Sequence, residues 1–200
     1  MRKVVVSEFV SLDGVMEAPD KWHFPFFNEE AGKYKFDELF ASDALLLGRV
    51  TYEGFAAAWP SRSNGEGFTD SPTMDDEKAF ADMMNGLPKY VVSTTLEEPL
   101  GWNNSTLIEG NVAEEVSRLK QLSGKDILVF GSTELVNTLM QHDLIDEYRL
   151  MVFPVVVGSG KRLFRDGSDT KALRLVDAKP LSSGVVVLTY QPRGKEVEGA

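Results

Sequence analysis

Three short apolar segments of the chain are each followed by residues of the kind that bind phosphate groups. The three following runs are Gly48-Arg49-Val50-Thr51, Ser93-Thr94-Thr95 and Gly131-Ser132-Thr133. If the apolar segments are parallel strands, their carboxyl ends line one crevice of the sheet. Glycine lets a backbone approach a pyrophosphate, the hydroxyls can donate hydrogen bonds, and Arg49 could pair with a phosphate. We therefore expect residues 48–51, 93–94 and 131–133 to converge on a dinucleotide. Strand termination and helix capping remain the alternative for any single turn.

A carboxylate and a group of aromatic side chains follow the first apolar segment. Asp13 precedes Gly14, a pair that is typical of a turn, although a carboxylate there could also bind a polar substrate or assist proton transfer. The aromatic loop contains Trp22, His23, Phe24, Phe26 and Phe27. These side chains either pack in the core or form a wall against which a ligand stacks, and Trp22 is the candidate for substrate contact.

A glycine pair late in the chain resembles a phosphate loop only superficially. Gly158-Ser159-Gly160-Lys161-Arg162 lacks the spacing of a Walker motif and the third glycine of the dinucleotide fingerprint. We expect a turn or a bulge here, with Lys161 and Arg162 able to face an anionic ligand.

Apolar runs and capping residues predict an alternation of strands and helices. The expected strands are 4–12, 44–47, 90–93, 106–108, 127–130, 147–157, 172–178 and 185–191. The expected helices are 28–42, 52–59, 74–85, 112–122 and one that follows Ser132. Asn28 and Ser132 are expected to cap the first and the last of them, and the helix 52–59 is expected to be opened by Thr51 and ended by Pro60. Residues 61–73 are expected to form a loop. The alternation favours a mainly parallel sheet, and the short connection 182–184 favours an antiparallel final pair. We expect one domain over residues 1–200.

Composition excludes several classes of protein and of site. The chain has 200 residues, a formal net charge of −10, no cysteine and two histidines far apart, so disulfides, thiol nucleophiles and the usual metal sites are not expected. The acidic balance disfavours binding of nucleic acid, and only Lys161, Arg162 and Arg165 support such binding. No apolar run is long enough for a signal peptide or a membrane span, so we expect a soluble cytoplasmic protein.

Taken in order along the chain, these segments resemble the dihydrofolate reductase-like superfamily, and most closely the reductase domain of the riboflavin-biosynthesis deaminase/reductase. The matching segments are Ser11–Gly14, Leu46–Glu53, Tyr90–Ser93, Ile127–Ser132, Leu144–Leu150 and Pro154–Phe164. Each segment is a weak signal, but the ordered set is specific.

The resemblance implies an α/β fold with a predominantly parallel sheet of about eight strands and helices on both faces. It also implies NADPH as cofactor, a homodimer, and a role for particular residues. Gly48, Arg49 and Thr51 resemble the turn that binds the cofactor phosphates, with Arg49 toward the 2′-phosphate. Ser93 and Thr94 resemble the adenosine-phosphate side, and Gly131, Ser132 and Thr133 resemble the turn under the pyrophosphate. Asp13 resembles the aspartate near the substrate.

The resemblance predicts an NADPH-dependent reductase that transfers hydride to a small heteroaromatic or imine-like molecule, such as a 5-amino-6-ribosylaminouracil-type or pterin-like compound. The chain departs from the dihydrofolate reductase pattern in one respect: the carboxylate that protonates dihydrofolate has only Asp37 and Glu38 as candidates, by position. The alternative is therefore a catalytically silent member of the fold that binds a nucleotide or another small ligand.

Overall fold

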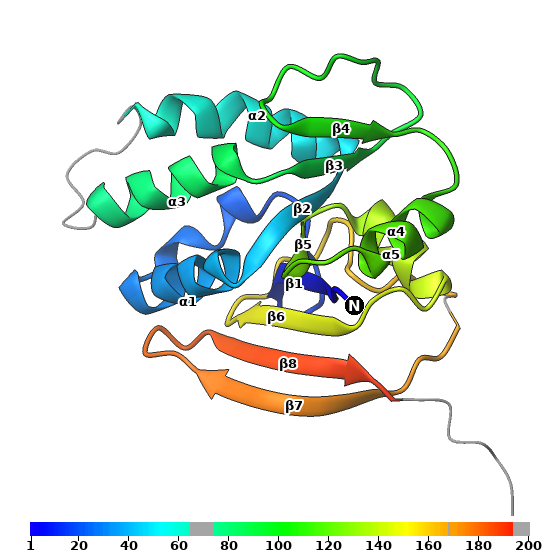
Figure 1. Ribbon diagram of the computed structural model, residues 1–200. Coiled ribbons are helices and arrows are strands. Elements are labelled where there is room, and N and C mark those ends of the chain that lie inside the picture. Colours follow the sequence, from blue (N-terminus) through cyan, green and yellow to red (C-terminus); the bar gives the residue numbers. More distant parts are fainter. Residues whose placement is uncertain (65–73, 168, 194–200) are drawn as a thin grey trace, which may run out of the picture.

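One eight-stranded sheet, in the order β4-β3-β2-β5-β1-β6-β8-β7, runs through the computed structural model, which describes residues 1–64, 74–167 and 169–193 (Figure 1). The strands are β1 Val4–Ser11, β2 Ser42–Gly48, β3 Lys89–Val92, β4 Ser105–Ile108, β5 Asp126–Phe130, β6 Glu147–Phe153, β7 Leu173–Pro180 and β8 Val186–Pro192. The first six strands in sequence pair in parallel, whereas β8 is antiparallel to both β6 and β7. The expected mainly parallel sheet with an antiparallel C-terminal pair is confirmed.

Helices cover both faces of the sheet, because successive side chains of its central strands point to opposite faces. The helices are α1 Glu29–Phe40, α2 Arg49–Ser63, α3 Met74–Gly86, α4 Val112–Gln121 and α5 Thr133–Gln141. Val5 of β1 packs in a cluster with residues of α1, α2 and α3. Its neighbours Val4 and Val6 pack in another cluster with residues of α4 and α5. The central strands are therefore apolar on both faces, as parallel strands between two helical layers must be.

The start of α1 is fixed by its capping residue, as the sequence predicts. The Asn28 side chain accepts a hydrogen bond from the Ala31 N–H at 3.0 Å and donates one to Ser182 Oγ at 3.0 Å. Glu30 in the first turn accepts from the Ser182 N–H at 2.9 Å. These contacts join the beginning of α1 to the turn between β7 and β8.

The ends of the helix expected over 52–59 and of the strand expected over 147–157 are wrong. A tertiary contact determines where the helix ends, and a proline determines where the strand ends. Pro60 lies inside α2, which continues to Ser63. The last turn is held from α3, since Asn85 donates hydrogen bonds to the Trp59 carbonyl at 3.0 Å and to Ser63 Oγ at 2.6 Å. The loop expected over 61–73 therefore begins later, and residues 65–73 lie outside the described part of the chain.

The second wrong boundary is the end of the strand expected over 147–157. The strand β6 ends at Phe153 because the next residue, Pro154, has no N–H to donate to a neighbouring strand. The chain beyond it continues alongside the end of β1, where Leu12 N donates to the Val155 carbonyl at 2.9 Å.

A buried lysine, Lys89, fixes the beginning of β3, and Ser93 directly follows the end of this strand. The Lys89 residue is 0% exposed, and its ammonium donates to the carbonyls of Asn85, Leu87 and Asn103 at 2.7–2.9 Å. The ammonium also lies 4.4 Å from the centre of the Trp102 ring. Burial lowers the pKa of Lys89 to about 8, and the three carbonyl acceptors compensate the charge that remains below that pH.

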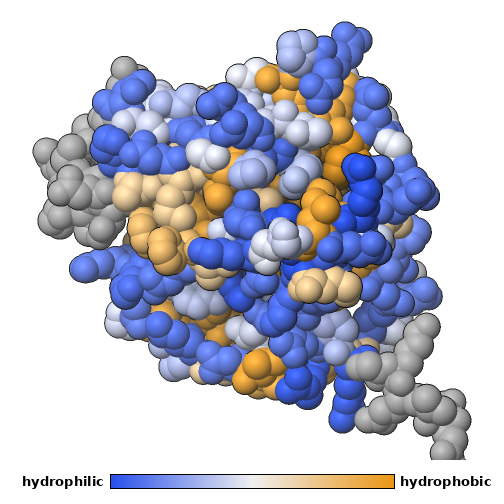
Figure 2. Space-filling model, in the orientation of Figure 1, coloured by the Kyte–Doolittle hydropathy of each residue, from blue (hydrophilic) through white to orange (hydrophobic). Residues whose placement is uncertain are grey.

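Hydrophilic residues dominate the face of the molecule drawn in Figure 2, and apolar atoms appear there as separate patches. Across the described ranges, we find no helix with both the length and the apolar character needed to cross a bilayer.

Replacing Asn28 by alanine is expected to lower the free energy of unfolding by about 1 kcal/mol, because the Ala31 N–H loses its acceptor. The measurement is urea-induced unfolding followed by circular dichroism. Asn28→Asp keeps an acceptor at the cap and serves as the matched control, with stability close to the wild type. Equal losses in the two variants would show that the cap does not contribute in this way.

Candidate functional site

The strand order brings together the turns that the sequence singles out. The neighbouring strands β3, β2, β5 and β1 are parallel, so their carboxyl ends meet at one edge of the sheet. Gly48 is the partner of Val92 in the β2/β3 ladder, and Phe130 is the partner of Ser7 in β1. Runs 48–51, 93–94 and 131–133 therefore lie side by side, at the edge where ligands bind in open α/β sheets.

The hydroxyl of Ser132 joins the first turns of α2 and α5. Its Oγ accepts a hydrogen bond from the Gly48 N–H at 2.8 Å and lies 2.8 Å from Thr51 Oγ1. A Cβ atom added to Gly48 would lie 2.6 Å from Ser132 Oγ, and one added to Gly131 would lie 2.7 Å from Thr51 Oγ1. Only glycine allows these approaches, so two helix N-termini with unpaired N–H groups lie next to each other.

Ser132 does not cap α5 in the way that the sequence predicts. Its backbone is left-handed, with φ 67°, and its side chain makes no capping hydrogen bond to the helix. Because the hydroxyl is used for the contact with Gly48 and Thr51, the expected local interaction is replaced by one between distant segments. Thr133 is the first residue of the helix.

Ser93 and Thr94 differ in what they can offer a ligand. Ser93 is buried, and its Oγ accepts hydrogen bonds from the N–H groups of Thr95 and Leu96, both at 3.1 Å. It therefore shapes the turn after β3. Thr94 is exposed, so its side chain is the accessible hydroxyl of this pair.

Arg49 lies at the exposed start of α2. Its guanidinium forms an ion pair with Glu53 at 2.9 Å, one helical turn later, and about half of each side chain is exposed. Exposed pairs of this kind contribute little to stability. Arg49 can therefore exchange this partner for an anionic ligand.

Asp13 lies at the carboxyl end of β1, where the sequence places it, but its carboxylate is already fully engaged. It accepts hydrogen bonds from Ser11 Oγ at 2.7 Å and from the N–H groups of Val157 and Gly158 at 3.0 and 2.8 Å. These donors, Ser11 first, lower the pKa of Asp13 to about 2. A carboxylate held in this way is a poor proton donor, and its hydrogen bonds fix the segment after β6.

Trp22 of the aromatic loop packs in the core, and its contact with substrate stays a prediction. Trp22 is 8% exposed, lies edge-on to Phe153 at 5.5 Å between ring centres, and donates its ring N–H to the Glu17 carbonyl at 3.1 Å. The burial of this ring and its satisfied N–H favour a packing role. His23 also packs here, and burial lowers its pKa. Phe24 is largely exposed.

The two carboxylates that α1 offers by position differ in burial. Asp37 is exposed and pairs with Lys33 at 3.0 Å. Glu38 is buried, accepts a hydrogen bond from Ser7 Oγ at 2.7 Å, and pairs with Lys35 at 2.6 Å and with Arg149 at 3.5 Å. The structure thus places Glu38 in a buried ionic network.

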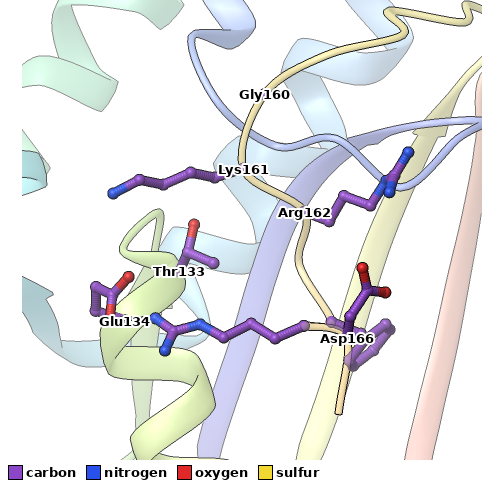
Figure 3. Close-up of a pocket in the computed structure, with 8 residues that line it drawn as sticks. Thr133, Glu134, Gly160, Lys161, Arg162 and Asp166 are labelled. Atoms are coloured by element: carbon purple, nitrogen blue, oxygen red, sulfur yellow. Dashed lines mark ion pairs between the residues drawn. The ribbon is translucent and has the colours of Figure 1, made fainter. Parts of the chain in front are cut away.

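The glycine pair at residues 158–160 lies in an irregular segment that packs against the end of β1. Met16 N donates to the Lys161 carbonyl at 2.9 Å, and Arg162 Nε donates to the Asp13 carbonyl at 3.1 Å. A hollow of about 260 Å³ lies between this segment and the start of α5. Lys161 and Arg162 extend to opposite sides of the segment, and the Thr133 hydroxyl points toward Lys161 (Figure 3). Arg165 forms an ion pair with Glu134.

Sequence reasoning missed one titratable residue at this edge, Glu8. It is 3% exposed, and its Oε2 accepts a hydrogen bond from the Gly131 N–H at 3.0 Å. Burial raises its pKa well above the usual range for glutamate, although Lys35 and the Gly131 N–H act in the opposite direction. The signal in the sequence was a lone charge inside an apolar strand.

Comparison with known proteins places the chain in a family. A family model of the RibD C-terminal domain matches residues 2–187. YyaP, an uncharacterised protein of Bacillus subtilis (strain 168), is 32% identical over 204 residues, which cover 96% of each chain.

Two solved structures share the fold at low sequence identity. One is a protein of Shewanella sp. PV-4 assigned provisionally to riboflavin biosynthesis, with a TM-score of 0.71 at 20% identity, over 96% of this chain and 99% of the other. The second is a diaminohydroxyphosphoribosylaminopyrimidine deaminase/5-amino-6-(5-phosphoribosylamino)uracil reductase of Thermotoga maritima. Its TM-score is 0.62 at 13% identity, over 96% of this chain and 57% of the other. The sequence match and the shared fold confirm the resemblance, and the chain belongs to the RibD C-terminal domain family.

Proposed function

We propose that this protein is an NADPH-dependent reductase that transfers hydride to a small heteroaromatic or imine-like molecule. The observation that carries the proposal is the contact of Ser132 with Gly48 and Thr51, which joins the starts of α2 and α5. Membership of the RibD C-terminal domain family supports it, because the Thermotoga relative by fold is described as a reductase.

The two glycine positions fit a dinucleotide. At both Gly48 and Gly131 an added Cβ atom would collide with a hydroxyl of the neighbouring turn, so the two turns approach each other closely. Backbone N–H groups at two helix N-termini favour the negative charge of a pyrophosphate. These two features support the proposal that a pyrophosphate binds at this corner.

The residues that would hold NADPH are those at the three strand ends. Arg49 would bind the 2′-phosphate, and Ser93 and Thr94 would shape and line the adenosine side. Gly48, Thr51, Gly131, Ser132 and Thr133 would surround the pyrophosphate. When bound, NADPH supplies the hydride, and the protein supplies position and electrostatics.

Asp13 would act on the substrate side by holding residues 157–158 in place. Its pKa of about 2 keeps it ionised at neutral pH, so it orients groups and does not donate a proton. Because Asp13 and Glu38 are engaged within the chain and Asp37 has only an exposed ion pair, a second candidate function is nucleotide binding without catalysis. NADPH oxidation with a panel of pterins, flavin precursors and quinones separates the two: binding without turnover on any of them would favour the second.

Titration of the purified protein with NADPH is expected to give a saturable change in nicotinamide fluorescence at submillimolar cofactor. Arg49→Ala is expected to weaken NADPH binding about tenfold and NADH binding much less, because NADH lacks the 2′-phosphate that the guanidinium would bind. Glu53→Gln is the matched control, since it removes the partner of Arg49 and should keep or improve NADPH affinity. The absence of any saturable signal from the wild type would end the reductase proposal.

Gly48→Ala is expected to lower the free energy of unfolding by about 1–3 kcal/mol, because the new methyl group overlaps Ser132 Oγ. The backbone at Gly48 has φ −84°, which alanine adopts readily, so the effect is steric. NADPH affinity should fall with it. Gly54→Ala, also in α2, meets nothing within 4 Å and should raise stability by up to about 1 kcal/mol. Thermal unfolding and NADPH titration of both variants check this; similar behaviour of the two would contradict it.

Asp13→Asn is expected to flatten the pH dependence of stability in acid while sparing NADPH affinity. The folded pKa of Asp13 lies below its ordinary value of 3.8, so the ionised carboxylate stabilises the fold above that value. The stabilisation is lost as the pH falls from 3.8 to about 2. Urea unfolding across this range should show a steeper decline for the wild type than for the variant. A variant with an unchanged slope would show that Asp13 is not responsible.

A further inference from the structure

Glu8 is a carboxyl group buried in the sheet directly beside the turn that begins α5. Its neighbour Ser7 is the partner of Phe130 in the β1/β5 ladder, which brings Glu8 to Gly131. One oxygen, Oε2, accepts the Gly131 N–H. The other, Oε1, is buried and has no hydrogen-bond partner among the described residues. A buried polar atom without a hydrogen-bond partner destabilises the folded state, so this carboxyl is poorly suited to an architectural role alone.

The charges around Glu8 leave it without a dedicated counter-ion. Lys35 of α1 attracts its ionised form and Glu38 of α1 repels it. The Lys35 ammonium is itself bound to Ser7 Oγ at 2.5 Å and to Glu38 at 2.6 Å. On β6, Arg149 pairs with Glu38 and Glu147. At the start of α5, Glu134 is exposed and pairs with Arg165. These elements satisfy one another's charges, and burial makes the neutral form of Glu8 favourable.

The turn that Glu8 holds has two successive residues in the left-handed region, Gly131 with φ 61° and Ser132 with φ 67°. Such a conformation costs free energy at a non-glycine residue and persists where its surroundings impose it. Here it is fixed from two directions, by the carboxyl of Glu8 on Gly131 and by Gly48 and Thr51 on Ser132.

We propose that Glu8 is a positioning residue whose neutral carboxyl holds the Gly131–Ser132 turn for an anionic dinucleotide, so that nucleotide binding is coupled to protonation of Glu8. The inference rests on the proposed function, because it takes the bound nucleotide to lie at this turn. An ionised Glu8 beneath the turn would repel the phosphates in a medium of low dielectric constant. Bound nucleotide therefore favours the protonated carboxyl, and by linkage protonation favours binding.

The test is the number of protons taken up when NADP⁺ binds, measured by titration calorimetry in buffers of different ionisation enthalpy from about pH 5 to about pH 9. The wild type should take up as many as about one proton more than Glu8→Gln, which keeps an acceptor for Gly131 but cannot ionise. Above the pKa of Glu8, affinity of the wild type should fall by up to about tenfold per pH unit relative to the variant. Comparing the wild type with Glu8→Gln at each pH removes the contribution of the 2′-phosphate, which itself titrates at about pH 6.

Glu134→Gln is the matched control, because it removes an exposed carboxylate from the first turn of the same helix. It should keep the proton uptake of the wild type. If wild type and Glu8→Gln both bind NADP⁺ with equal proton uptake at every pH, the inference is overturned while the proposed function stands. If the wild type binds no NADP⁺, both fail.

A second measurement uses the wild type alone, in case Glu8→Gln does not fold. Infrared difference spectra between the free and the NADP⁺-bound protein, recorded over the same pH range, report protonated carboxyl groups directly. A gain of carboxylic-acid absorption on binding is expected at the pH values where calorimetry shows proton uptake. Binding without such a gain at any pH would contradict the coupling.

Discussion

The hydroxyl of Ser132 links two parts of the chain that are more than eighty residues apart in sequence. It accepts the Gly48 N–H and contacts Thr51 Oγ1, and through these contacts the first turns of α2 and α5 are held side by side. The contact demands glycine at 48 and 131, because a side chain at either position would enter the space of a hydroxyl. It also demands that β2 and β5 be neighbours and parallel, so that both helices start at the same edge. The candidate site therefore follows from the strand order, in which β2 lies between β3 and β5.

The features that the sequence predicted well are those decided by a few neighbouring residues. Apolar runs followed by Gly48 and Gly131 marked the carboxyl ends of β2 and β5, and the Asn28 side chain does cap α1. Parallel pairing places the marked turns at one edge of the sheet, and the strand order β3-β2-β5 makes them neighbours. The regular alternation of strands and helices predicts the parallel pairing but not this strand order.

Where prediction failed, a contact from a distant segment outweighed a local preference. Pro60 should end a helix, yet Asn85 of α3 holds the turn beyond it. Ser132 has a good capping side chain, but its hydroxyl accepts a hydrogen bond from the Gly48 N–H instead. The significance of Glu8 depends on Gly131 and Lys35, neither of which is near it in sequence.

An anionic dinucleotide poses a difficulty for a protein with a net charge of −10. The acidic side chains near the candidate site answer it in different ways, each of which limits repulsion. Glu53 and Glu134 are paired with arginines, and Asp13 is surrounded by three hydrogen-bond donors. Glu8 is buried, and burial favours its neutral form. These four acidic side chains are thus paired, hydrogen-bonded or favoured in the neutral form, while the helix N-termini at the strand ends present partial positive charge. Local compensation of this kind would let an acidic protein bind phosphate groups, since screening by salt weakens distant charges far more than adjacent ones.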